Sequence, residues 1–199
     1  MVPAARTRRS TPTSTVTVDS AVAATIAVTE HLRQRFSQDK IFLLAHSGGS
    51  LLGVLAVQRR PDLFRAYIGT GQAVHLPTTD RIFYDDILAW AQATNHGALA
   101  RRLTELGPPP YGDFYSYEPI ITPENTVYAY DRSRNAEGAG GFAENLNVPE
   151  YTLLEKLHTV NAIIDTWSVL YLRMQEVDLR TDARRLQVPV CFVHDAHEP

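Results

Sequence analysis

The chain has 199 residues, of which 44% are hydrophobic and 21% are charged, a balance typical of one water-soluble globular domain. The formal net charge of −3 excludes an overall basic field that would recruit nucleic acid or an anionic membrane. The single cysteine, Cys191, excludes an internal disulfide and a four-thiolate zinc site, and it is expected to be a buried strand residue.

The first part of the chain alternates between helical and strand-like patterns. Residues 1–17 are rich in Ser, Thr and Arg and contain no acidic residue, so they are expected to form a disordered leader. Apolar residues recur at near-helical spacing over residues 18–36, which predicts an amphipathic helix. The continuous apolar run 41–45 predicts a parallel strand buried on both faces, and residues 51–60 predict a helix that ends before a proline. A second short buried strand is predicted at 66–69.

The second part of the chain is expected to be mainly helical before it returns to the sheet. Helices are predicted over residues 79–94 and 98–106, one or two more over 151–177, and a third buried strand over 188–193. Helix and strand patterns in this order are typical of an α/β fold with a parallel sheet. Residues 72–186 are then a helical insertion between the second and third strands.

The most informative segment, residues 45–49 (AHSGG), joins the strand at 41–45 to the following helix. Small residues two positions before and two after Ser47 let the strand and the helix approach closely, as in a nucleophile elbow. Such a turn projects the Ser47 hydroxyl above the carboxyl end of the sheet and directs the Gly48 N–H toward the position of an oxyanion. The alternative is an ordinary strand-to-helix turn in which Ser47 caps the helix. A phosphate-binding loop is disfavoured, because the glycines have neither the Walker nor the dinucleotide spacing.

These residues, with several further motifs, resemble the α/β-hydrolase superfamily and in particular its helical-cap branch, similar to prolyl iminopeptidases. The resemblance extends over about residues 17–199 and rests on segments 45–53, 58–64, 69–72, 103–111 and 188–193. It implies an incomplete α/β-hydrolase fold, truncated at both ends, with a short parallel sheet. Residues 18–71 and 187–199 are then a partial core, and residues 72–186 are a helical cap. The implied function is that of a serine hydrolase acting on an amide or an ester, as an aminopeptidase or an esterase does.

The resemblance assigns the catalytic roles only in part. Ser47 is the nucleophile, the Gly48 N–H is the oxyanion donor, and Glu198 falls at the position of the acid that orients the catalytic histidine. Asp195 is a second candidate for this acid. The family's histidine follows one strand later, and no histidine of this chain matches it, so the chain is expected to be inactive or weakly active by itself. The alternative function is a non-catalytic hydrolase remnant that binds a small molecule or a protein partner.

Further expectations concern ligands and partners. The insertion is rich in aromatic residues that suit a pocket for a small-molecule or peptide substrate. Cap carboxylates hold the substrate's ammonium group in aminopeptidases of this type, and the candidates here are Glu105, Glu118, Glu144 and Glu150. No cofactor, metal ion, nucleic acid or membrane partner is expected, and the protein is expected to be cytoplasmic. The strand at 41–45 is expected to lack a neighbour on one side, which would allow self-association through an exposed sheet edge.

Overall fold

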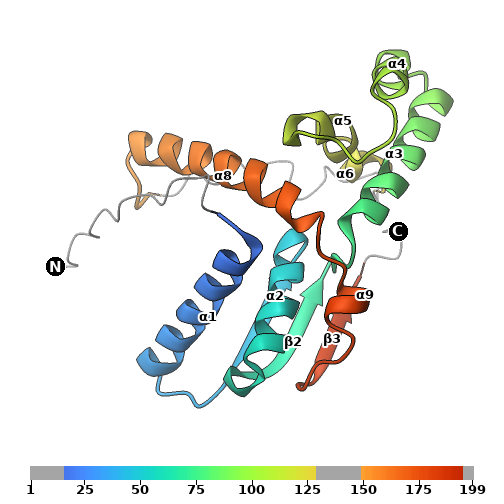
Figure 1. Cartoon of the computed structure of the whole chain (residues 1–199). Coiled ribbons are helices and arrows are strands. Elements are labelled where there is room, and N and C mark those ends of the chain that lie inside the picture. The colour runs from blue at the N-terminus through green and yellow to red at the C-terminus, as the bar shows by residue number, and fades with distance from the viewer. Residues whose placement is uncertain (1–15, 129–148, 195–199) are drawn as a thin grey trace.

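A computed structural model of the chain describes residues 16–128 and 149–194. Its elements follow the order that the sequence predicts, with a small sheet and helices around it (Figure 1). The strands are β1 (Ile41–His46), β2 (Phe64–Thr70) and β3 (Val190–Val193). The longer helices are α1 (Val18–Arg35), α2 (Gly48–Arg59), α3 (Leu76–Ala93), α4 (Gly97–Leu106) and α8 (Leu153–Met174). Shorter helices are α5 (Glu118–Ile121), α6 (Glu124–Val127) and α9 (Leu179–Asp182).

Local sequence signals determine where several helices begin and end. Thr17 forms a reciprocal capping box with the first turn of α1, which satisfies backbone N–H groups that have no partner within the helix. Thr152 and Glu155 form the same kind of box at the start of α8. α2 ends at Arg59, because Pro61 cannot continue the helical hydrogen bonding, and the chain then enters β2.

The sheet is parallel with strand order β1-β2-β3, so β2 is its central strand. α1 and α2 lie together on one side of this sheet (Figure 1). Ala45 of β1 and Tyr67 of β2 both come close to α2 at Gly53. The core on this side of the sheet includes Leu51, Val54, Val57, Leu63, Phe64 and Tyr67.

The other face of the sheet differs from the sequence prediction. Residues 41–45 are predicted to be buried on both faces, but Phe42 and Leu44 are 63% and 65% exposed, in alternation with half-buried residues. Cys191 on β3 is predicted to be buried, and it is exposed. The prediction for residues 41–45 is wrong because α1 and α2 cover a single face of β1, whereas a strand buried on both faces needs helices on each side. The prediction for Cys191 is wrong because all four residues of the edge strand β3 are exposed, so its side chains are buried on neither face. No helix among the described residues covers the side of β1 that carries Phe42 and Leu44.

The described residues between β2 and β3 are mainly helical, as the sequence predicts. The expected helix at 151–177 is the single element α8, which crosses above α1 and α2, while α3 rises from the carboxyl end of β2 (Figure 1). Segments distant in the sequence therefore meet at the carboxyl end of the sheet. Within residues 16–128 and 149–194, no helix combines the length and the apolar character that crossing a bilayer requires.

The close contact of α2 with the sheet predicts that an alanine at position 53 is destabilising. A Cβ atom on Gly53 would lie 2.9 Å from both Ala45 Cβ and Tyr67 Cε2, which is closer than real Cβ contacts. Gly53→Ala should therefore lower the free energy of unfolding by about 1–3 kcal/mol in urea denaturation. Gly49→Ala on the same helix is the matched control, because its Cβ would meet nothing within 4 Å. Equal stability of the two variants would contradict this packing.

Candidate active site

The turn between β1 and α2 holds Ser47 in an unusual backbone conformation. Ser47 has φ 51° and ψ −134°, a region that non-glycine residues seldom occupy and that costs about 1–3 kcal/mol. Its side chain makes no capping hydrogen bond to α2. The interpretation of Ser47 as an ordinary helix cap is therefore wrong, and the helix does not use its hydroxyl.

Backbone hydrogen bonds join this turn to the central strand and to the helix. The Ser47 N–H donates to the Thr70 carbonyl oxygen over 3.0 Å, which extends the β1-β2 ladder by one residue. The Ser47 carbonyl oxygen accepts from the Ser50 N–H over 2.8 Å and also from the Ser50 hydroxyl. Because the N–H and the carbonyl oxygen of Ser47 are both hydrogen-bonded, the turn cannot change its backbone angles without breaking these bonds.

A second group of contacts ties the turn to the loop after β2. The buried Ser50 hydroxyl oxygen accepts from the Ala73 N–H over 2.9 Å. The Tyr67 hydroxyl lies 2.9 Å from the Ser50 carbonyl oxygen and 2.7 Å from Gln72 Oε1. Burial raises the pKa of Tyr67 to about 12, so this hydroxyl stays a neutral donor at physiological pH. The loop at Gln72 and Ala73 is thereby fixed beside the turn.

A cavity of about 400 Å³ opens above the turn, at the carboxyl ends of the strands. Ser47 and Gly48 lie in its wall, together with residues from α3, α6 and α8. The side chains that give the cavity its chemical character are two carboxylates, three aromatic rings and two imidazoles: Asp80, Glu124, Phe83, Trp167, Tyr171, His46 and His194. Its volume is in the range of sites for small molecules.

Gly48, the first residue of α2, lies directly beneath α8. A Cβ atom on Gly48 would overlap the Trp167 ring and would lie 3.3 Å from Met174 Cε, so a larger residue here would require the Trp167 side chain to move. The Gly48 N–H belongs to the first turn of the helix, where backbone donors have no partner within the helix and favour negative charge. The turn thus offers a hydroxyl and an adjacent N–H donor to the same cavity.

Asp80 is a carboxylate buried in the cavity wall, with a residue exposure of 1%. It accepts hydrogen bonds from the Tyr171 hydroxyl over 2.5 Å and from Gln175 Nε2 over 2.7 Å. Burial raises the pKa of Asp80 above its usual range, and the two hydrogen bonds only partly oppose this effect. Burial and the neighbouring Asp80 charge also raise the pKa of Tyr171. In the described part of the chain no lysine, arginine or histidine forms a salt bridge with Asp80.

The structure brings only some of the predicted site residues together. Ser47 and Gly48 share the cavity with His194, which follows β3 directly. Glu198 and the second candidate acid, Asp195, lie outside the described residues. Within the described ranges, no three His, Cys, Asp or Glu side chains are grouped so that they could hold a metal ion.

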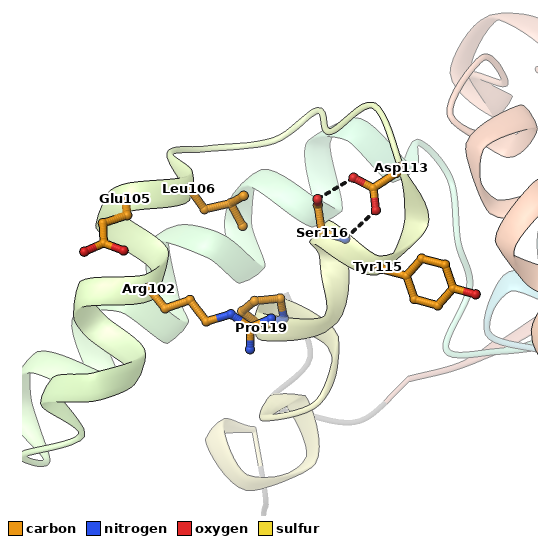
Figure 2. A pocket seen from close by; sticks show the side chains of 7 residues that line it. All are labelled: Arg102, Glu105, Leu106, Asp113, Tyr115, Ser116 and Pro119. Atoms are coloured by element: carbon orange, nitrogen blue, oxygen red, sulfur yellow. Dashed lines mark hydrogen bonds between the residues drawn. The ribbon is translucent and has the colours of Figure 1, made fainter.

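The three carboxylates predicted for substrate binding that fall in the described residues do not line this cavity. Glu105 lines a separate surface pocket of about 450 Å³ beside α4, and Figure 2 shows that it points away from the other side chains drawn there. Glu118 forms a salt bridge with Arg102 over 2.6 Å, Glu150 is exposed, and Glu144 lies outside the described residues.

Asp80 and Glu124 are the carboxylates that sequence reasoning missed. A signal for Asp80 was present, because it falls on the apolar stripe of α3 that also carries Leu76, Tyr84, Ile87 and Ala91. A charged residue within such a stripe is rarely buried without a functional or structural reason.

Comparison with known proteins finds one partial match to a hydrolase. The chain is 32% identical over 96 residues to a protein of Bacillus subtilis (strain 168) named probable aminopeptidase YbaC. The match covers 48% of this chain and 30% of that protein, so the chain spans less than a third of the relative's length. No protein-family profile and no solved structure matches the chain.

The buried carboxylate predicts a pH-dependent stability difference. Folding raises the pKa of Asp80 above the unfolded value of about 3.8. The stability that the protonated Asp80 contributes is therefore complete below pH 3.8 and is lost as the pH rises through the folded pKa. Asp80→Asn stays neutral, so its free energy of unfolding relative to the wild type should increase from pH 4 upward. Urea denaturation at pH 4 to 8 measures this difference.

Asp85→Asn is the matched control, because Asp85 lies on the same helix in an exposed ion pair with Arg81. Its stability relative to the wild type should change little over this pH range, since exposed pairs contribute about 0–1 kcal/mol. A flat Asp80→Asn difference from pH 4 to 8 would contradict the burial of an ionisable carboxyl group at this position.

Proposed function

We propose that the protein is a serine hydrolase of the capped α/β-hydrolase type, with Ser47 as its nucleophile, acting on an amide or an ester. The observation that carries the proposal is the positive φ of Ser47 at a strand-to-helix junction, where its side chain does not cap the helix and the residue lines a cavity. In this proposal residues 18–71 and 187–199 are the partial core, and residues 72–186 are the cap.

The reaction would follow from the geometry of the turn. The Ser47 hydroxyl oxygen attacks the substrate's carbonyl carbon, and the oxygen of the tetrahedral intermediate accepts a hydrogen bond from the Gly48 N–H. Collapse of this intermediate breaks the bond to the amine or alcohol, which leaves with the proton of the Ser47 hydroxyl, and an acyl-enzyme remains. Water then hydrolyses the acyl-enzyme to the free acid and restores the Ser47 hydroxyl. Glu198 has the role of the orienting acid in this proposal. Activation of Ser47 requires a proton acceptor, and no histidine of this sequence stands at the family's position, so we expect a low rate from residues 1–199 tested by themselves.

The cavity favours a small substrate with an amino group. Its aromatic rings offer apolar surface, and the Glu124 carboxylate in the cavity wall gives a cationic group of the substrate an anionic neighbour. The aminopeptidase name of the Bacillus relative supports an amide substrate over an ester. A volume of about 400 Å³ suits a single amino acid residue and its leaving group better than a folded protein chain.

Covalent labelling with a fluorophosphonate tests the nucleophile. We expect slow reaction at Ser47, located by peptide mass spectrometry, and no adduct in Ser47→Ala. Ser37 is a built-in control, because it also has a positive φ of 50° but lies in the turn after α1, away from the cavity. If positive φ alone made a serine reactive, Ser37 would be labelled too, so an adduct at Ser47 alone supports the site.

The same experiment distinguishes the alternative function. A folded protein that gives no adduct at Ser47, even at high reagent concentration, would contradict the hydrolase proposal and favour a remnant that binds a ligand without chemistry. Circular dichroism on the same sample establishes that the protein is folded. Labelling spread equally over Ser37 and Ser47 would also contradict the proposal, because the cavity would then confer no reactivity.

A further inference from the structure

The buried Asp80 carboxylate connects two helices that are far apart in the sequence. It lies on α3, and its two hydrogen-bond donors, Tyr171 and Gln175, lie 91 and 95 residues later at the carboxyl end of α8. In Figure 1 this end of α8 approaches the sheet, beside the start of α3. One carboxylate thus joins the helix that follows β2 to the helix that crosses over α2.

The same end of α8 carries the side chains that cover the Ser47 turn. Trp167, Tyr171 and Met174 are spaced four and three residues apart, so they share one face of the helix. Trp167 and Met174 contact Gly48, and the rings of Trp167 and Tyr171 have their centroids 5.7 Å apart. The hydrogen bond that holds Tyr171 in place therefore also restricts the position of Trp167, one helical turn earlier.

Within residues 16–128 and 149–194, the other end of α8 has few contacts that could hold the helix in place. Leu153, Leu154 and Leu157 are 71%, 62% and 50% exposed, and the first turns of α8 extend away from the sheet (Figure 1). The position of Trp167 thus depends on the carboxyl half of the helix. Within that half, the bonds to Asp80 are directional, whereas the apolar contacts tolerate sliding.

We propose that Asp80 is a positioning residue, whose carboxylate holds α8 so that Trp167 lies on Gly48 and closes one side of the Ser47 cavity. Burying a carboxylate costs stability, and an apolar side chain would fill the same space at lower cost. The carboxylate specifies one orientation of α8 through two bonds of fixed geometry. Trp167 then limits the size of the group that a ligand can place beside the Gly48 N–H.

This inference adds to the proposed function but is tested without it. The chain has two tryptophans, Trp90 and Trp167, so Trp90→Phe leaves Trp167 as a single fluorescent reporter at the cavity. Trp90 stacks on His96 near the end of α3 and does not line the Ser47 cavity, so it can be replaced without removing a cavity side chain. Acrylamide quenching of the folded full chain then measures how well α8 covers Trp167.

In this background Asp80→Ala should increase the quenching constant of Trp167 about twofold or more, with a red shift of its emission. Asp80→Asn should keep wild-type quenching, because its amide oxygen can accept from Tyr171 and its NH₂ can donate to Gln175 Oε1 once the Gln175 amide turns by 180°. This oxygen is a buried acceptor without a partner in the described structure. Asp85→Ala, on the same helix but exposed, should also leave quenching unchanged. A purely structural role would lower the urea midpoint without altering quenching of the native state.

Unchanged quenching in a folded Asp80→Ala protein would overturn the proposal. If this variant does not fold, Tyr171→Phe replaces it, since that change removes only the hydroxyl donor and keeps the ring. It should raise the quenching constant by a smaller factor, and wild-type quenching in Tyr171→Phe would equally overturn the proposal. Neither outcome depends on whether Ser47 reacts with a phosphonate.

Discussion

The close approach of β1, β2 and α2 is the constraint on which the rest of this structure depends. Gly53 has no side chain where Ala45 and Tyr67 come closest, so α2 can begin immediately after the strand. Ser47 takes up the sharp change of direction with a positive φ. Strain of this kind persists only where the surroundings fix the backbone, as the hydrogen bonds to Thr70 and Ser50 do here. Ser47 and Gly48, the first residue of α2, line the cavity as a consequence.

Features determined by residues close in sequence could be predicted. The apolar run before Ser47, the small residues around it and the helix that follows it all lie within about twelve positions, and the structure has the strand, the turn and the helix there. The carboxyl end of α2 follows from Pro61, and a capping box marks the start of α8. Such signals act through local backbone chemistry and need no knowledge of the fold.

Features that depend on distant partners could not be predicted in the same way. Phe42 and Leu44 were wrongly predicted to be buried, because an apolar run does not indicate whether a second layer of helices covers the strand. The contact of Trp167 with Gly48 and the bonds of Asp80 join segments about 90 to 120 residues apart, and no spacing rule connects them. The cavity's carboxylates were missed for this reason, although the place of Asp80 on an apolar stripe gave a partial signal.

The central claim is that Ser47 has a strained backbone conformation in the turn between β1 and α2 and directs its hydroxyl into the cavity. A crystal structure of the chain tests this most directly, because it gives the backbone angles of Ser47 and the direction of its side chain without reference to activity. The account predicts a φ near +50°, with the hydroxyl facing the cavity beside the Gly48 N–H and beneath Trp167. A Ser47 with helical or extended backbone angles, or with its hydroxyl bonded to the first turn of α2, would contradict it.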